Sequence, residues 1–240
     1  MLRLRRVLLV VVSLFLFAHL AVAQTRPSDP RELIKSGNAK YERAEYESAI
    51  DDYRRVSPAA GETYAQALYN IGVCYYELWR TEDAVAMYRK AIEARRGRYP
   101  RAFYSLGVAL EDLRRTAEAR TAYQQALDAA EKTNAPAYFR LGLIAAGADD
   151  FATAANLFRE ALSQSPAQSP ACHNNLGVTL ARTGRLREAE REFMIAVSQG
   201  NTAFPEARHN LDLCRSLLMT HAGVKVASLQ LIHLSNLTAN

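Results

Sequence analysis

Apolar residues along this chain recur at the spacing of one face of an α-helix, and a glycine interrupts that face four times. In YSLGVAL (Tyr104–Leu110), Leu106 and Leu110 lie on such a face with Gly107 between them. A glycine inside a helix costs about 1 kcal/mol relative to alanine, so a compensating gain is expected. The same arrangement recurs in YNIGVCY (69–75), FRLGLIA (139–145) and NNLGVTL (174–180). The glycine therefore belongs to a repeated unit.

The repeat has a period of 35 residues and covers the chain after its N-terminus. The glycine column is Gly37, Gly72, Gly107, Gly142 and Gly177, and Asp212 continues the series. Twelve residues after each glycine is an alanine: Ala49, Ala84, Ala119, Ala154, Ala189. Four residues later is an aromatic ring: Tyr53, Tyr88, Tyr123, Phe158, Phe193. Three further on is a small residue: Val56, Ala91, Ala126, Ala161, Ala196. These spacings place one face on a second helix, so each unit is predicted to be a helix pair.

The glycine column is explained by close packing between the two helices of a pair. Without a Cβ on the first helix, we expect the alanine of the second helix to approach it backbone to backbone, with the aromatic ring alongside. Five glycines forgo about 5 kcal/mol of helix propensity. Apolar burial, at about 25 cal/mol per Å², can exceed that loss several-fold over five pairs.

Prolines indicate where the first helix of a unit begins, because a first-turn proline loses no hydrogen bond. They are Pro30, Pro100, Pro136, Pro170 and Pro205. Asp29, Pro30 and Glu32 also form the pattern of a helix N-cap, a first-turn proline and a capping-box glutamate. First helices are predicted to begin near residues 30, 64, 100, 136, 170 and 205, and return helices near 46, 81, 116, 150 and 185. The prediction is eleven helices and no strand.

The first 23 residues are predicted to be a cleavable signal peptide. Arg3, Arg5 and Arg6 precede an uncharged apolar run, Val7–Ala18, and the small-residue pattern Ala21-Val22-Ala23 follows. Cleavage after Ala23 would leave residues 24–29 as a linker. The alternative is an uncleaved membrane anchor, although the run is shorter than the roughly 20 apolar residues of a spanning helix.

Charge and cysteine content narrow the range of partners. The formal net charge is +5, and removing the three arginines of the leader, with no acidic residue, leaves +2. No basic stripe interleaved with aromatics follows, so a nucleic-acid partner is not expected. Three cysteines leave at least one unpaired. Cys74 and Cys214 are interpreted as packing residues, and a disulfide between Cys172 and Cys214 remains open.

The sequence offers no convincing catalytic, metal or cofactor site. Cys172 and His173 are neighbours, but adjacent helical residues point about 100° apart and cannot form a nucleophile–base pair. The histidines lack metal-ligand spacing, and every recurring glycine is used in helix packing rather than in a phosphate loop. We therefore expect no enzyme activity, no metal, no cofactor and no small-molecule substrate.

The column pattern of Leu106, Gly107 and Leu110 followed by Ala119, Tyr123 and Ala126 resembles the tetratricopeptide repeat family. That resemblance implies an all-α, right-handed solenoid of five helix pairs and a C-terminal capping helix. The pairs would occupy about 30–64, 65–99, 100–134, 135–169 and 170–204, with the cap at 205–220. The period is 35 rather than about 34 residues, which places the extra residue in the loop between units. The tail, 221–240, has mixed periodicity and either packs on the last helix or binds a partner.

The resemblance also implies a concave groove lined by the first helices. One column facing it reads Ile34, Tyr69, Tyr104, Phe139, Asn174, His209. The hypothesis is that its aromatic members hold apolar side chains of a bound peptide. Further candidate peptide-binding residues beside this ladder are Asn38, Tyr41, Asn70, Tyr76 and Arg101. The alternative is that these rings pack between helices and belong to the core, and solvent exposure separates the two.

One subfamily binds the C-terminal carboxylate of its ligand through lysine, asparagine and arginine side chains of three repeats. Asn38 and Asn70 match that set and Arg101 is a conservative match, but Ile34 and Ser105 replace the first lysine and the last arginine. The set is incomplete, so a carboxylate clamp is a minor hypothesis.

These observations lead to the expectation of an exported adaptor or assembly scaffold, most simply periplasmic or secreted. Its partner would be a protein or peptide, which can be part of a membrane-associated complex. Two alternatives stand beside it: a structural spacer or self-associating subunit without a groove ligand, and a peptide-holding chaperone for exported proteins. An adaptor would have one dominant partner, a chaperone many weak ones, and a spacer none.

Overall fold

The computed structural model describes residues 29–164, 170–200, 205–220 and 228–232. Within these ranges every regular element is helical. The paired helices are α2 (Pro30–Glu42) with α3 (Tyr46–Arg54), α4 (Glu62–Glu77) with α5 (Thr81–Ala94), α6 (Pro100–Asp112) with α7 (Thr116–Ala129), α8 (Ala135–Gly147) with α9 (Phe151–Gln164), and α10 (Pro170–Arg182) with α11 (Leu186–Gly200). A single helix, α12 (Pro205–Thr220), follows them, and a short 3-10 turn, η1 (Pro58–Ala60), precedes α4.

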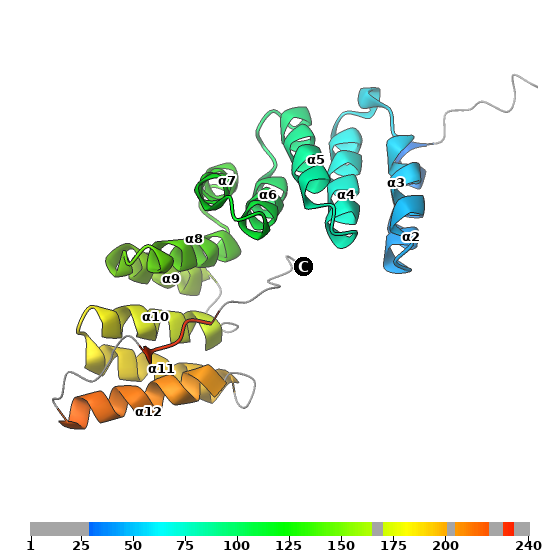
Figure 1. The fold of residues 1–240 in the computed structure, drawn as a ribbon. Helices are drawn as coiled ribbons and strands as arrows, with labels where there is room; N and C mark the ends of the chain where they lie inside the picture. Colours follow the sequence, from blue (N-terminus) through cyan, green and yellow to red (C-terminus); the bar gives the residue numbers. More distant parts are fainter. Residues whose placement is uncertain (1–28, 165–169, 201–204, 221–227, 233–240) are drawn as a thin grey trace, which may run out of the picture.

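The helix pairs follow one another in a curved row (Figure 1). Each second helix packs on the first helix of the next pair, and α12 packs on α11 and α10. Helix starts differ from the predicted ones by at most two residues, and five pairs with one terminal helix confirm the predicted architecture. The predicted leader, most of the linker and most of the tail lie outside the described residues.

Local sequence explains where the helices begin. The side chain of Asp29 accepts a hydrogen bond from the Arg31 amide at 2.9 Å, which confirms it as the N-cap of α2. Asn134 caps α8 in the same way, through the Ala137 amide at 3.1 Å. Each therefore satisfies one of the N–H groups that a helix start leaves without an intrahelical partner.

Two residues after the first helix of every pair ends, the chain has a residue with left-handed backbone conformation. These residues are Ala44, Trp79, Arg114, Asp149 and Gly184, with φ between 58° and 79°. The amide of the residue after each donates to a carbonyl five residues earlier, as Arg115 does to Leu110 at 2.8 Å. This is the bonding of a Schellman motif, which usually has glycine at the left-handed position. Here only the last pair has glycine there.

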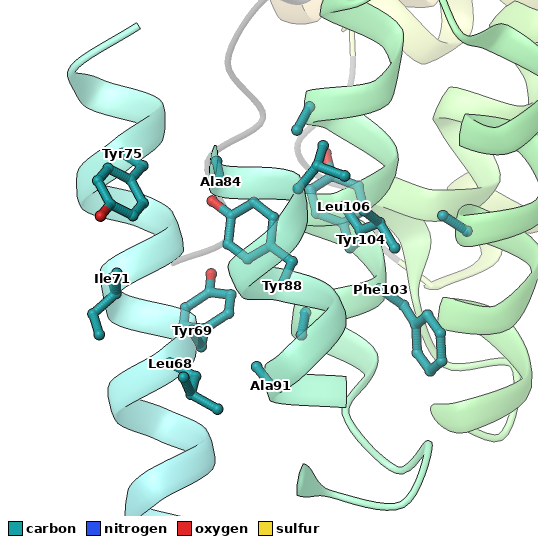
Figure 2. Close-up of a cluster of buried hydrophobic side chains, with 14 of the residues drawn as sticks. Leu68, Tyr69, Ile71, Tyr75, Ala84, Tyr88, Ala91, Phe103, Tyr104 and Leu106 are labelled. Carbon is teal, nitrogen blue, oxygen red and sulfur yellow. The ribbon is translucent and has the colours of Figure 1, made fainter. Parts of the chain in front are cut away.

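The core explains the glycine column, with one correction. A Cβ added to Gly72, Gly142 or Gly177 would lie 2.7 Å from a carbon of the aromatic ring on the second helix. The ring, rather than the alanine that we expected, therefore lies directly over each glycine. The alanine column is fully buried beside it. Figure 2 shows this packing around Tyr88, between α4 and α6.

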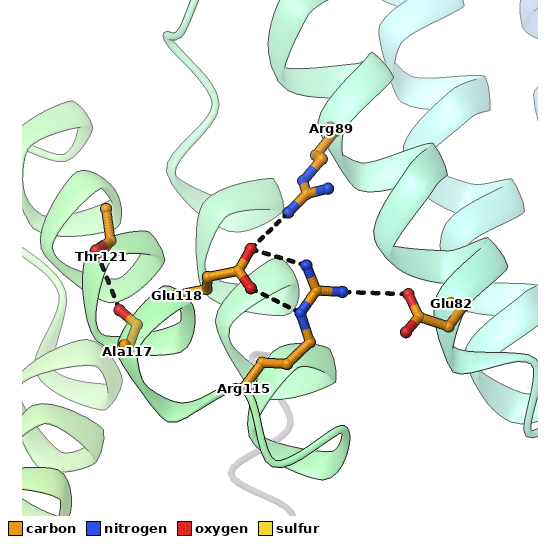
Figure 3. Close-up of polar contacts among 6 residues, drawn as sticks. All are labelled: Glu82, Arg89, Arg115, Ala117, Glu118 and Thr121. Atoms are coloured by element: carbon orange, nitrogen blue, oxygen red, sulfur yellow. Dashed lines mark hydrogen bonds and ion pairs between the residues drawn. The ribbon is translucent and has the colours of Figure 1, made fainter.

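Exposed ion pairs link neighbouring second helices on the outside of the stack (Figure 3). Arg115 is bonded to Glu118 at 2.7 Å and reaches Glu82 of the preceding pair at 3.3 Å, while Arg89 contacts Glu118 at 3.0 Å. Because all four side chains are about one-third exposed or more, water screens these ion pairs and each contributes little to stability. The stack is held mainly by its core.

Candidate functional site

The aromatic ladder expected along the groove is buried. Tyr69, Tyr104 and Phe139 are at most 6% exposed, and each ring packs on the ring that covers the glycine of its own pair. The ring centroids are 5.6 Å apart for Tyr69 and Tyr88, and 5.7 Å apart for Phe139 and Phe158. The exposure that a peptide-holding ladder needs is therefore absent at these three positions. Their rings serve the core, as the packing alternative held, because their column borders the face that meets the second helix.

Asn38, Asn70 and Arg101 do lie at the surface of the first three pairs. The Asn38 side-chain oxygen accepts hydrogen bonds from the Tyr53 hydroxyl at 2.8 Å and from the Asn70 amide at 3.1 Å. The Arg101 guanidinium lies over the Tyr69 ring, 5.0 Å from its centroid. The structure thus brings the two asparagines together. A role for these residues in peptide binding stays a prediction.

Tyr41 and Tyr76 are half-buried and connect neighbouring pairs. The Tyr41 hydroxyl donates to Glu77 at 3.2 Å, and the Tyr76 hydroxyl donates to Asp112. Burial and the nearby carboxylate raise the pKa of each phenol well above its usual value. Both hydroxyls therefore stay protonated and already have an acceptor.

The middle of the stack carries a buried charged group. The Tyr123 hydroxyl donates to Glu111, and the Arg140 guanidinium lies 3.5 Å from the same carboxylate. Within the described part of the chain, Nε of Arg140 is the one buried side-chain nitrogen or oxygen without a hydrogen bond. Burial, together with the charge of Glu111, raises the pKa of Tyr123 far above its usual value.

Arg140 belongs to a polar column that runs the length of the stack. Its members, 35 residues apart, are Lys35, Asn70, Ser105, Arg140, Asn175 and Asn210. Of this column, the sequence-based set of site residues included only Asn70, and it missed Asn175 and Asn210. Both missed asparagines are fully buried, as is Asn174 beside them. A column that stays polar through five repeats and the terminal helix is a signal that could have identified them.

The missed asparagines hold the main chain of the tail. The Asn175 amide donates to the Ile232 carbonyl at 2.8 Å and accepts from the Ile232 amide at 2.7 Å. The Asn210 amide does the same with Gln230, at 2.8 and 2.9 Å. Asn174 also donates to the Gln230 carbonyl, at 3.0 Å. We call Asn174, Asn175 and Asn210 the asparagine clamp.

The clamp treats residues 228–232 as an extended peptide. It binds the N–H and C=O of alternate residues, which is the pattern that one edge of a β-strand offers to its neighbour. Each carboxamide supplies one donor and one acceptor, so it replaces one residue of a neighbouring strand. Because only main-chain atoms are bonded, these contacts do not depend on the side chains of the bound segment.

Side chains of the segment enter the core of the C-terminal half. Leu229 and Ile232 are 5% and 6% exposed and pack in the same cluster as Phe139 and Leu176. A hollow of about 450 Å³ adjoins the segment, lined by Phe151, Val178 and Leu231 among others. Figure 1 shows the segment, in red, crossing α10. The described part of the tail, residues 228–232, therefore packs on α10 and α12.

The remaining candidates have structural roles. Cys74, Cys172 and Cys214 are buried and not disulfide-bonded, and the thiols of Cys172 and Cys214 donate to backbone carbonyls at 3.3 and 3.4 Å. Burial raises the pKa of Cys214 to about 11. His173 Nδ1 lies 2.7 Å from the Glu192 carboxylate, linking α10 to α11.

Two searches of the described residues were negative. They contain no helix that is both long and apolar enough to cross a bilayer. Three or more His, Cys, Asp or Glu side chains nowhere gather, in this part of the chain, as they would around a metal ion.

Several solved structures share the fold. MamA from Desulfovibrio magneticus RS-1 is 20% identical, with a TM-score of 0.61 over 73% of this chain and 98% of its own. Pseudomonas aeruginosa PilF is 18% identical, with a TM-score of 0.61 over 82% and 95%. YrrB, described as a TPR protein with an unusual peptide-binding site, is 24% identical, with a TM-score of 0.60 over 79% and 94%. Comparison with curated proteins gives no match.

Family models find the same repeats in the sequence itself. A model described as tetratricopeptide repeat matches residues 34–99 and 78–136, and a second model with that description matches 143–209. Proteins with such repeats are in general non-enzymatic modules for protein–protein interaction. Since the two models together span α3 to α11, over the helix pairs that the column pattern predicts, this chain belongs to the tetratricopeptide repeat family.

Proposed function

We propose that this chain is a scaffold that binds an extended segment of a partner protein in its groove, at the asparagine clamp. The observation that carries this proposal is the pairing of Asn175 and Asn210 with alternate residues of a peptide main chain. Main-chain bonding of this kind supplies affinity, while neighbouring pockets for side chains supply specificity. YrrB, whose described peptide-binding site is on the same fold, makes a groove ligand a reasonable expectation.

We further propose that the scaffold acts in the cell envelope after export. The support is the arginine-led apolar run Val7–Ala18 with Ala21-Val22-Ala23 after it, which has the form of a secretory signal. Fusion of residues 1–29 to a reporter enzyme that is active only after export tests the location. Reporter activity that survives replacement of the apolar run by polar residues would contradict the proposal.

The scaffold proposal is tested by affinity capture from native envelope extract with residues 24–240. The variant Asn175→Ala/Asn210→Ala removes the clamp, and Asn156→Ala is the matched control, because Asn156 is an exposed asparagine on α9 that accepts only a bond from Arg159. All three proteins are first compared for helicity by circular dichroism.

We expect one dominant partner to be captured by the parent and by Asn156→Ala and lost by the clamp variant. Capture of many weak partners that depend on the clamp would favour the chaperone alternative. That alternative follows from a clamp that bonds only the main chain, because such a clamp can accept many different sequences. Equal capture by all three proteins would place the binding surface elsewhere. No capture by any of them would favour the spacer alternative.

A further inference from the structure

We propose that residues 228–232 are a built-in occupant of the groove, which a partner peptide must displace and therefore resembles. The expected ligand is an extended peptide with two apolar side chains three residues apart, in the place of Leu229 and Ile232. This inference rests on the proposed function and adds to it the chemistry of the ligand and the way in which access is controlled.

The first step is that residues 228–232 occupy the hydrogen-bonding groups of the clamp that a second peptide would need. The carboxamide groups of Asn175 and Asn210 each have both a donor and an acceptor engaged by the tail main chain. The oxygen of Asn174 accepts from Asn210 at 2.8 Å, and its nitrogen is shared between Gln230 and Asn175. A second peptide cannot bind these groups while the tail is in place, so the two occupants exclude each other.

The second step is that side-chain burial defines a motif. Leu229 and Ile232 are buried among apolar residues of α8 to α12, whereas the Gln230 side chain is exposed. A peptide with apolar residues at the second and fifth positions of this five-residue segment, in the places of Leu229 and Ile232, can repeat its contacts. The residue between them that bonds Asn210 contributes through its main chain and is free to vary.

The third step is that the tail is tethered and not covalently fixed at the site. Only seven residues, 221–227, separate Thr220 at the end of α12 from Ser228. A short tether keeps the tail at an effective concentration that is on the order of millimolar. A free peptide must overcome that advantage, so the tail sets a threshold that only a well-matched or abundant partner exceeds.

A fluorescently labelled peptide with the sequence of residues 227–234, ASLQLIHL, is the probe, and its binding to residues 24–240 is measured by anisotropy. The variant Leu229→Asp/Ile232→Asp releases the tail by placing charges in an apolar cluster. The same variant with Asn175→Ala/Asn210→Ala lacks the clamp as well. Gln230→Ala is the matched control within the tail, since its contacts to the clamp are through the main chain.

We expect the tail-released variant to bind the probe at least about tenfold more tightly than the parent, because the tethered competitor is gone. Removal of the clamp should abolish this gain, and Gln230→Ala should bind like the parent. The parent and the tail-released variant could instead bind the probe equally tightly and both lose that binding when the clamp is removed. This result would overturn the proposal that residues 228–232 block the site, while leaving the proposed function intact. Tight binding that ignores the clamp would overturn both. Absence of binding to the tail-released variant would overturn the motif.

Amide hydrogen exchange on the parent gives a second test that needs no substitution in the tail. The amides of Gln230 and Ile232 should exchange slowly in the free protein, because Asn210 and Asn175 accept their hydrogen bonds. Saturating probe, whose label separates its fragments by mass, should raise their exchange rate and leave α6 and α7 unchanged. Slow exchange that persists with the probe bound, or fast exchange in the free protein, would contradict the proposal.

Discussion

At the scale of single residues, the repeat depends on positions where a side chain would be in the way. Each glycine of the 35-residue column lies under an aromatic ring of its partner helix, so the helix gives up propensity to admit that ring. In two of the pairs the hydroxyl of that ring also has a hydrogen-bond partner, since the Tyr53 and Tyr123 hydroxyls reach Asn38 and Glu111. The cost and the gain therefore arise at the same position.

Gly107→Ala should destabilise the protein, because a Cβ there would lie 2.5 Å from a ring carbon of Tyr123. Overpacking costs about 1–3 kcal/mol and the gain in helix propensity returns about 1, so we expect a net loss of up to about 2 kcal/mol. Urea unfolding measures it. Gly147→Ala is the control, since that helical glycine has nothing within 4 Å. Equal effects of the two substitutions would show that the ring does not set the requirement.

Trp79 illustrates the opposite case, a side chain where glycine would fit better. Its φ is 58° and its side chain is 92% exposed, so left-handed strain is not repaid by packing. Left-handed conformation costs about 1–2 kcal/mol for a residue with a Cβ, and substitution by glycine removes that cost. Part of this gain is lost because glycine makes the unfolded chain more flexible. Trp79→Gly should therefore raise the free energy of unfolding by about 0.5–1 kcal/mol, measured by thermal or urea unfolding, with Trp79→Phe unchanged. A loss of stability in Trp79→Gly would mean that the indole does contribute.

At the scale of elements, the first pair is joined by a carboxylate that crosses from α3 to α2. Asp52 accepts a hydrogen bond from Ser36 at 2.6 Å and lies 2.7 Å from the Lys40 ammonium. Burial alone would raise the pKa of Asp52, but the hydrogen bonds from Lys40 and Ser36 and the charges of Lys40 and Arg55 lower it overall. A folded-state pKa below the unfolded one stabilises the folded form wherever the carboxylate is ionised.

Asp52→Asn should therefore lower the stability at pH 7 by about 1.5–3 kcal/mol, which is the range for a hydrogen bond to a charged group. The stabilisation is complete above the unfolded pKa of about 3.9 and is lost as the pH falls through the lower folded pKa. The stabilities of parent and variant, measured by chemical unfolding, should consequently converge as the pH falls below the folded-state pKa of Asp52. Asp51→Asn is the control, because Asp51 is largely exposed and 3.8 Å from Arg54. A gap that stays constant with pH would refute the assignment to the Asp52 charge.

Elements were far easier to predict from the sequence than the site. Prolines, the glycine column and its period set the helix starts to within two residues, because each acts through local backbone chemistry. The ladder of Tyr69, Tyr104 and Phe139 was placed on the groove because its column borders the core-facing one, and only packing decides on which side a ring lies. Asn175 and Asn210 bond main-chain atoms of the tail, and such contacts leave no side-chain pattern in the tail.

At the scale of the whole molecule, the stack has contacts between neighbours and few beyond them. In such a solenoid, stability is approximately the sum of the intrinsic terms of the repeats and the interfaces between adjacent ones. The tail modifies this picture at one end, because Ile232 is bonded to α10 and Gln230 to α12. These residues therefore connect α10 and α12, which otherwise contact each other less than they contact α11.

Removing one side chain of this connection should loosen the C-terminal end alone. Asn210→Ala leaves the Asn174 oxygen and the Gln230 amide without the partner that now binds them, while the Gln230 carbonyl keeps the bond from Asn174. Unsatisfied buried polar groups cost about 1–3 kcal/mol, so amide protection in α12 and residues 228–232 should fall roughly tenfold or more. Protection in α4 to α7 should not change, because coupling decays over successive interfaces. Hydrogen exchange followed by mass spectrometry measures both regions, with Asn156→Ala as control. A uniform fall along the chain would instead mean that the five pairs unfold as one unit, and that the tail stabilises all of them.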